Sequence, residues 1–188
     1  MKRRLIVGIS GADGVCIGAR LLGHLRNMDG IETHLVMTEA AERNLLLEGG
    51  PSPDEVRALA DVCHDVHNLA ATIASGSFIT EGMIIAPCSM KSLAALVSGY
   101  TDNLLQRAAD VCLKEGRRVV LIPREMPLGR IHLRNMLAAS ELGCVVVPPV
   151  LTFYNRPQSV MDHVDHIIAK SLMPFGIALD TFRPWEGR

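Results

Sequence analysis

Short apolar runs that alternate with helix-forming segments constrain the fold of this chain more than any other feature. Each run is rich in β-branched residues and almost continuously apolar, which is typical of strands covered on both faces. The runs span residues 4–10, 33–37, 82–87, 117–123 and 144–150. We therefore expect an α/β fold: a single-domain doubly wound (Rossmann-like, flavodoxin-like) parallel sheet with helices on both faces.

Helical periodicity occupies the intervals between these runs. The predicted helices span residues 16–26, 38–47, 101–115, 132–142 and 160–172. A further helix opens at the capping box Ser52-Pro53-Asp54-Glu55, with proline at the first helical position, and runs toward residue 60. We see no internal repeat or linker. We expect one domain over residues 1–188, with 174–188 as a C-terminal arm.

Composition narrows the class of protein. The formal net charge of −1 argues against a nucleic-acid or anionic-membrane surface, which would need a basic excess. No apolar stretch is long enough to span a membrane, and the apolar part of the start is too short for a signal peptide. Five scattered cysteines are typical of reduced thiols, so we expect a cytoplasmic protein. Helices that are apolar over a wide arc indicate extensive subunit contacts.

A glycine-punctuated turn follows the first predicted strand and leads into a helix. Main-chain N–H groups in this setting bind phosphate. The spacing of Gly8, Gly11, Gly14 and Gly18 only approximates the dinucleotide fingerprint, and a carboxylate, Asp13, stands in the middle. The turn predicts a nucleotide or flavin site. The alternative is a tight strand-to-helix turn that binds no ligand.

Two more strands end in polar residues at the same predicted sheet edge. Cys88 to Ser92 offer hydroxyls and free N–H groups at the start of a helix, although Ser89 could simply cap that helix. Arg124 and Glu125 follow the run 117–123. Glu39, after the second strand, stands where a nicotinamide enzyme would place its ribose-binding acid.

Basic residues on a predicted helix and after a predicted strand could stabilise an anionic leaving group. Arg107 and Lys114 are seven residues apart and so lie on nearly the same helix face, with Asp110 placed to pair with Lys114. Together with Arg124 they predict a converging set of cations for phosphate. The alternative for Arg107 and Lys114 is an ordinary solvated helix face.

An aromatic loop precedes the last helix. Phe153, Tyr154, Asn155 and Arg156 follow the run 144–150, and Lys170 lies on the helix beyond. A phenol and cations beside an apolar loop suit a small apolar phosphate ester, whereas the alternative is a loop anchor.

Histidines and cysteines offer weaker signals. Cys63, His64 and His67, and the pair His163 and His166, have ligand-like spacing without a complete metal motif, so we expect ordinary histidines. Cys88 lacks a sequence-visible base for nucleophilic catalysis.

Taken together, these stretches make the chain resemble the flavin prenyltransferase family (UbiX-type proteins). The motifs that carry the resemblance are SGSF, PCSMKSLA, TDNLL through RAADVCLKE, PREMPL, IHLRNM and FYNRPQS. The resemblance implies a homododecamer that binds FMN at subunit interfaces and uses no metal. It also implies transfer of a dimethylallyl group from dimethylallyl monophosphate to atoms N5 and C6 of reduced FMN. The product, prenylated FMN, would serve a UbiD-type decarboxylase.

The resemblance also implies roles for individual residues. FMN would contact Gly11, Ala12, Asp13, Thr38, Ser89, Met90, Lys91, Ser92 and Arg124. The prenyl phosphate would be held by Arg107, Lys114, Tyr154 and Lys170, with Glu125 from a neighbouring subunit. Glu48 would handle a proton near the flavin, and Trp185 would lie near the substrate.

Three departures from the family pattern bear on activity. Asp13 replaces a small hydroxyl residue, Ile17 replaces a commonly aromatic one, and Thr38-Glu39 replaces Ser-Lys. An unpaired acid near the flavin would disfavour anionic ligands, unless it points to solvent or pairs with an arginine. Asp13 therefore leaves a second hypothesis, an FMN or prenyl-FMN binding protein with weak or no transferase activity. Flavin-dependent cysteine decarboxylases, which need a histidine that SGSFITEG lacks, and nicotinamide oxidoreductases are weaker alternatives.

Overall fold

The computed structural model describes residues 2–187. Short 3₁₀ helices, labelled η, complete the regular structure. In chain order the elements are β1 (Arg3–Ile9), α1 (Cys16–Arg26), β2 (Ile31–Met37), α2 (Glu39–Leu47), α3 (Pro53–Arg57), β3 (Val62–His64), η1 (Thr72–Ala74), β4 (Gly82–Cys88), α4 (Met90–Ser98), α5 (Leu104–Lys114), β5 (Arg118–Pro123), α6 (Arg130–Glu141), β6 (Val145–Val146), α7 (Val160–Leu172) and η2 (Met173–Phe175).

The strands form one parallel sheet in the order β3-β2-β1-β4-β5-β6, so the predicted doubly wound fold is confirmed. Its switch point lies between β1 and β4, where a crevice opens outside the carboxyl ends of the strands. β6 is shorter than the predicted run 144–150, because Pro148 and Pro149 have no N–H to donate to a neighbouring strand. The edge strand β3 was not predicted, because three residues of mixed polarity carry no clear pattern.

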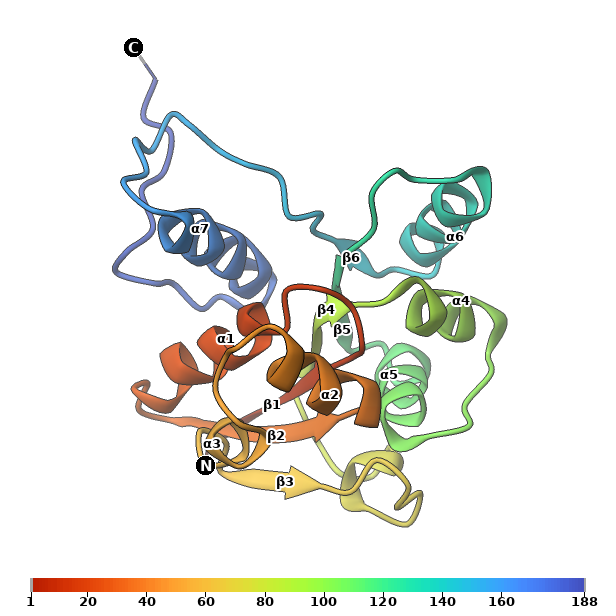
Figure 1. Cartoon of the computed structure of the whole chain (residues 1–188). Helices are drawn as coiled ribbons and strands as arrows, with labels where there is room; N and C mark the ends of the chain where they lie inside the picture. The colour runs from red at the N-terminus through yellow and green to blue at the C-terminus, as the bar shows by residue number, and fades with distance from the viewer. Residues whose placement is uncertain (1, 188) are drawn as a thin grey trace.

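Helices cover both faces of the sheet (Figure 1), with α1 and α7 on one side and α4, α5 and α6 on the other. Alternate side chains of β1 enter two separate cores: Leu5, Val7 and Ile9 pack with the α1 and α7 side, and Ile6 with the α5 side. Because both faces are buried, the strands read as continuous apolar runs.

Helix boundaries follow their caps. The predicted helices at 16–26 and 160–172 are confirmed, as is the capping box at Ser52. α2 begins one residue later than predicted, because Thr38 is its N-cap and accepts from the Ala41 N–H at 3.2 Å. α5 begins at Leu104 rather than residue 101, because Asn103 caps it.

The glycines of the first turn have packing roles. A Cβ on Gly11 would lie 2.3 Å from the Cβ of Ala40, and one on Gly18 would lie 2.3 Å from the carbonyl oxygen of Ala86. Gly14 has a φ of +85°, which a side chain would strain. These glycines therefore let α1 and α2 approach the sheet closely, whether or not a ligand binds.

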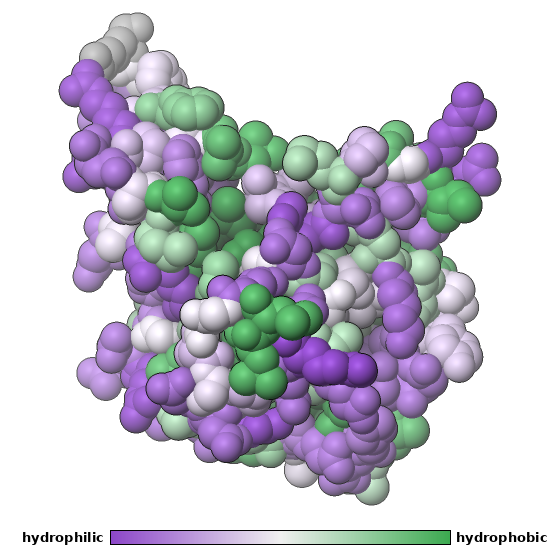
Figure 2. All heavy atoms as spheres, viewed as in Figure 1, coloured by the Kyte–Doolittle hydropathy of each residue, from purple (hydrophilic) through white to green (hydrophobic). Residues whose placement is uncertain are grey.

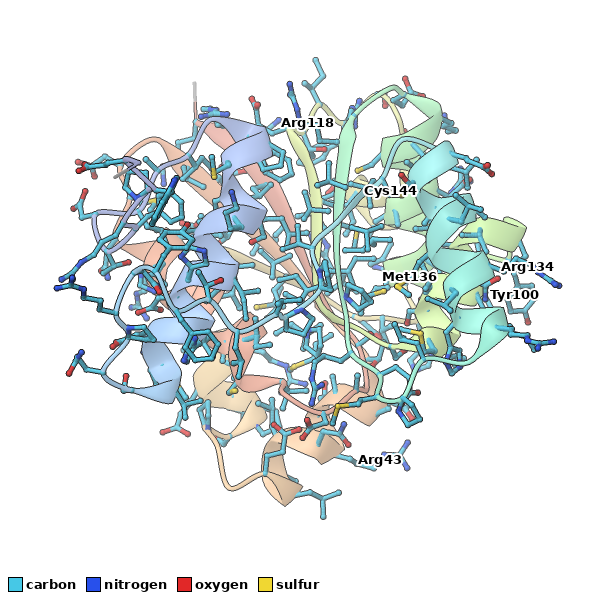
Figure 3. All side chains as sticks on the ribbon, turned by 90° about the horizontal axis from the view of Figure 1, so that it is seen from above. Arg43, Tyr100, Arg118, Arg134, Met136 and Cys144 are labelled. Atoms are coloured by element: carbon cyan, nitrogen blue, oxygen red, sulfur yellow. The ribbon has the colours of Figure 1, made fainter. Side chains whose placement is uncertain are left out.

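Two peripheral segments differ in how they are anchored. The C-terminal segment is fixed through Ile177 and Leu179, which are buried in the core beside α1 and α7. α6 packs against α4 and β6, and Ala139 is its one fully buried residue in a single chain. In Figure 3, Met136 points from α6 toward the sheet and Arg134 points away from it. Within residues 2–187, every helix is too short or too polar to cross a bilayer.

Candidate active site

Hydrogen bonds tie together the two strand ends that flank the switch point. Ser10, directly after β1, donates from its hydroxyl to the Pro87 carbonyl at 2.9 Å. The same hydroxyl oxygen accepts the main-chain N–H of Ser89 at 2.8 Å. Ser10 is 1% exposed, so these bonds form away from competing water. The glycine turn and the start of α4 are thus held as one rigid edge.

A cavity of ≈ 600 Å³ opens at this edge, within the range of roughly 300–1,000 Å³ that is typical of ligand pockets. It brings together seven of the residues predicted for ligand binding: Gly11, Thr38, Ser89, Met90, Lys91, Ser92 and Glu125. Its remaining lining residues are Glu39, Ala40, Arg43, Val66, His67, Asp102 and Asn103. The strand ends therefore converge as the sequence predicted.

The start of α4 has the capping role that the sequence offered as one alternative, and binding of a ligand there stays a prediction. The Ser89 hydroxyl accepts the Ser92 N–H at 3.2 Å, so Ser89 is indeed the N-cap. The first-turn N–H groups of Met90 and Lys91 still face the helix end, which favours an anion. The residues present therefore fit the phosphate of a flavin nucleotide.

The turn after β1 is anchored from α2. The Asn44 side chain donates to the Ala12 carbonyl at 3.1 Å, and the Gly14 N–H donates to the Glu48 carboxylate at 2.9 Å. Glu48 thus lies beside the turn, although it does not line the cavity itself. Burial, and then the charges of Glu48 and Asp13, raise the pKa of the neighbouring Cys16 thiol.

Asp13 is paired with an arginine. Its carboxylate contacts Nη2 of Arg124, and its main-chain carbonyl accepts from Nε of Arg124 at 3.2 Å. Glu39 is also paired, with His67 at 3.1 Å and Arg43 at 3.7 Å, and it is two-thirds exposed. Both acids that depart from the family pattern therefore have cationic partners.

Tyr154 and Trp185, both far from the glycine turn in the sequence, are in contact with each other. Their rings meet edge to face with centroids 5.6 Å apart, and Tyr154 makes a similar contact with His166. His166 stacks on Phe182, and the Lys170 ammonium lies 5.8 Å from the centroid of the Phe182 ring. Three of the residues predicted for the prenyl donor, Tyr154, Lys170 and Trp185, thus belong to one aromatic cluster formed by the loop before α7, α7 itself and the C-terminal arm.

The predicted convergence of Lys114 with Arg124 is wrong within one chain. α5 runs back from the carboxyl edge toward the start of β5, which places Lys114 about 15 Å along the helix from Leu104. The predicted pair of Asp110 with Lys114 is absent too: Asp110 binds Arg107 at 3.0 Å, and Lys114 binds Glu115 at 2.5 Å.

Arg107 and Lys114 instead border the SGSF segment. Arg107 donates to the Ala74 carbonyl at 3.3 Å. A Cβ on Gly76 would lie 2.1 Å from the carboxylate of Glu115, the partner of Lys114. These residues form what we call the α5 surface, defined as residues 74–78 with Arg107, Lys114 and Glu115.

Other chemistry-bearing residues are accounted for structurally. Cys88 is fully buried, and burial raises its pKa to about 12, so it stays a thiol at neutral pH. His64 shares a hydrogen bond of 2.9 Å with buried His34. Among residues 2–187, no group of three or more His, Cys, Asp or Glu side chains could hold a metal ion.

Sequence reasoning missed one buried ion pair. Asp165 of α7 receives two hydrogen bonds from Arg20, at 2.5 and 2.6 Å, and lies 2.8 Å from His24. Arg20 and His24 are four residues apart on α1, so they lie on the same face of the helix. This spacing does not indicate which acidic residue they contact. This cluster joins the helices that carry the turn and the aromatic cluster.

Comparison with known proteins decides the family. The Flavoprotein family model matches residues 1–174. A probable UbiX-like flavin prenyltransferase of Sedimentibacter hydroxybenzoicus is 54% identical over 184 residues, covering 98% of this chain and 97% of that protein. The flavin prenyltransferase UbiX of Escherichia coli O157:H7 is 54% identical over 187 residues, covering 98% and 99%. The chain belongs to the UbiX-type flavin prenyltransferase family.

Solved structures of UbiX-type proteins agree closely with the fold. A dodecameric FMN-dependent UbiX-like decarboxylase from Escherichia coli O157:H7 has a TM-score of 0.95 at 53% identity, covering 98% of this chain and 100% of that one. AnUbiX (PadA1), in complex with FMN and dimethylallyl pyrophosphate, has a TM-score of 0.97 at 45% identity over 100% of both chains. The FMN-dependent cysteine decarboxylase SpaF, at 20% identity and a TM-score of 0.63, shares the fold alone.

Proposed function

We propose that this UbiX-type protein is a flavin prenyltransferase, which joins the dimethylallyl group of dimethylallyl monophosphate to reduced FMN. The observation that carries the proposal is the convergence of Thr38, Ser89–Ser92 and Glu125 on one cavity at the switch point. The complex of AnUbiX with FMN and dimethylallyl pyrophosphate supports FMN and a dimethylallyl phosphate ester as the ligands.

FMN supplies the nucleophilic ring atoms that accept the prenyl group. The hydroxyls of Thr38 and Ser89 and the N–H groups of Met90 and Lys91 would bind and orient FMN at the sheet edge. Glu48, fixed by the Gly14 N–H, would hold a proton beside the turn. These roles preorganise the site before the prenyl donor enters.

Breaking the allylic C–O bond of the singly protonated phosphate ester leaves an allyl cation and a hydrogen phosphate dianion. Cations fixed around the departing oxygens stabilise this charge as it develops. Arg107, Lys114 and Lys170, with the Tyr154 hydroxyl, would supply this stabilisation. An apolar, aromatic surrounding such as Tyr154 and Trp185 would exclude water from the allyl cation.

These donor-binding residues belong to different subunits in our proposal. Among residues 2–187 of one chain, no hydrogen bond or ion pair joins the α5 surface to the aromatic cluster. A homododecamer, as in the Escherichia coli O157:H7 structure, would bring the α5 surface of one subunit against the sheet edge of another.

Exposed apolar side chains support such an assembly. Ile131, Leu133 and Leu137 of α6 are each at least half exposed. Figure 2 shows a further hydrophobic patch over the end of α2, where Leu46 and Leu47 are 67% and 83% exposed. Patches of this kind mark protein–protein contacts.

Anaerobic incubation with reduced FMN and dimethylallyl monophosphate, followed by mass spectrometry, tests the activity. We expect a flavin heavier by one prenyl unit. The Arg124→Ala variant should lose most of this product, whereas Arg26→Ala, at an exposed arginine near the end of α1, should retain it. FMN bound by the wild type without any heavier flavin would leave the second hypothesis, a flavin-binding protein without transferase activity.

The product would serve a UbiD-type decarboxylase. Adding the reaction mixture to such an enzyme prepared without cofactor should restore decarboxylation. FMN alone is the matched control. Equal activity with FMN and with the reaction mixture would contradict this role.

A further inference from the structure

Asp13 holds Arg124 through two contacts, next in sequence to Glu125, which lines the cavity. Nε of Arg124 donates to the Asp13 carbonyl at 3.2 Å, and Nη2 contacts the Asp13 carboxylate. Both bonds use the same side of the guanidinium, the side that binds a carboxylate or phosphate bidentately. Of the five N–H donors of Arg124, Asp13 engages two, and the Nη1 end remains for a ligand.

The main chains of both residues are fixed at the switch point. Ala12 and Gly14, on either side of Asp13, are bound by Asn44 and Glu48 of α2. The Arg124 N–H donates to the Cys88 carbonyl at the end of β4, at 3.1 Å. The pair therefore links the turn after β1 to the end of β5, and the main chain on both sides is held by hydrogen bonds.

We infer that Asp13 is a positioning residue for Arg124, which directs the guanidinium end-on toward a phosphate group and cancels part of its charge. This inference rests on the proposed function, because it concerns the same site. The phosphate belongs either to FMN or to the prenyl donor. The paired Asp13 thus replaces the family's hydroxyl without leaving an uncompensated charge.

Three variants separate orientation from charge. Asp13→Asn removes the charge but keeps a side-chain oxygen that can accept from Arg124, whereas Asp13→Ala removes both. Asp29→Asn is the matched control, because Asp29 is an exposed carboxylate just before β2, at the opposite edge of the sheet. Since Asp13 is itself 74% exposed, all variants should fold.

Binding is measured first, without turnover. Oxidised FMN and riboflavin are titrated by flavin fluorescence, and dimethylallyl monophosphate is titrated into the protein saturated with FMN. An exposed ion pair is worth about 0.2–1 kcal/mol, so we expect both Asp13 variants to bind the relevant phosphate about 1.4- to 5-fold more tightly. This gain should shrink at high salt.

The titrations with different ligands distinguish the phosphate of FMN from that of the prenyl donor. A gain for FMN but not for riboflavin, which lacks phosphate, assigns Arg124 to the flavin phosphate. A gain only for dimethylallyl monophosphate assigns it to the donor. No gain in either arm, or the same gain in Asp29→Asn, would overturn the inference.

Turnover then tests orientation. We expect kcat of prenyl transfer to fall several-fold in Asp13→Ala and to recover in Asp13→Asn, while KM falls in both. Equal kcat in all variants would contradict a positioning role. Absence of prenylated flavin in the wild type, despite this pattern of FMN affinities, would instead defeat the proposed transferase and leave the pairing intact.

Discussion

The Ser10 hydroxyl oxygen accepts the Ser89 N–H at 2.8 Å and so joins the end of β1 to the start of α4. Its own proton goes to the Pro87 carbonyl. One buried side chain thereby adds a link, beyond the pairing of β1 with β4, between two segments that border the proposed ligand site.

Replacing Ser10 with alanine leaves the Ser89 N–H and the Pro87 carbonyl without this partner. We expect a loss of about 1–3 kcal/mol in the free energy of unfolding, together with weaker FMN binding. Urea unfolding and flavin titration measure the two effects. Ser98→Ala, which removes the bond from an α4 serine to the Ala95 carbonyl, is the control. Unchanged FMN affinity in Ser10→Ala would show that the crevice does not need this link.

Asp165→Asn should loosen α7 from α1. Burial opposes the charge of Asp165, but hydrogen bonds from Arg20 and His24 outweigh it and hold the pKa of this carboxyl below its ordinary value of 3.8. Breaking a fully buried pair costs about 3–5 kcal/mol, and we expect about 2 kcal/mol here because Arg20 is 38% exposed.

The effect of Asp165 should depend on pH. A lowered pKa stabilises the fold above pH 3.8, and this contribution is lost as the pH falls through the folded-state pKa. The difference in stability between wild type and Asp165→Asn should therefore be full at pH 7 and shrink in strong acid. A difference that stays constant down to pH 2 would rule out the charged pair as its source.

Lys114→Ala and Arg124→Ala should each abolish most prenyl transfer, although the two residues lie at opposite edges of the sheet. Co-expressed in one oligomer, the two variants should regain part of the activity, because some sites then combine an intact Arg124 with an intact Lys114 from a neighbour. Activity per oligomer is measured by product mass. Absence of any recovery would mean that both residues act from the same chain.

The pair of buried His34 and half-buried His64 should make stability sensitive to mild acid. Burial, and then the charge of His34, lower the pKa of His64 below its ordinary value of 6.5. His34 also faces the carboxylate of Glu32, which is paired with Arg4. Because the unfolded chain binds the proton more readily, the free energy of unfolding should fall as the pH drops below about 6.5.

His64→Gln should reduce the dependence of the free energy of unfolding on pH in this range. His166, whose pKa is lowered by burial and by the charges of Lys170 and His163, should account for a further part. Urea unfolding between pH 8 and 5 measures the slope, and His67→Gln, at an exposed histidine, is the control. An identical slope in wild type and His64→Gln would contradict this assignment.

The main strands of the sheet, and the edge at which their carboxyl ends meet, could be predicted from the amino-acid sequence. Buried parallel strands must be apolar on both faces, so the runs at β1, β2, β4 and β5 were visible directly. Parallel strands all end at one edge, so polar residues after them, such as Thr38 and Ser89, had to meet there. Local caps at Thr38 and Ser52 likewise depend on neighbours within a few residues.

Which charged side chains form ion pairs could be seen only in the tertiary structure. Asp13 and Arg124 are 111 residues apart, and no local pattern pairs them. The direction of α5 along the sheet separates Lys114 from Arg124, although residue types alone suggested one cluster. Ion pairing depends on the distance between side chains across elements, whereas strand and cap signals lie within a single segment of the chain.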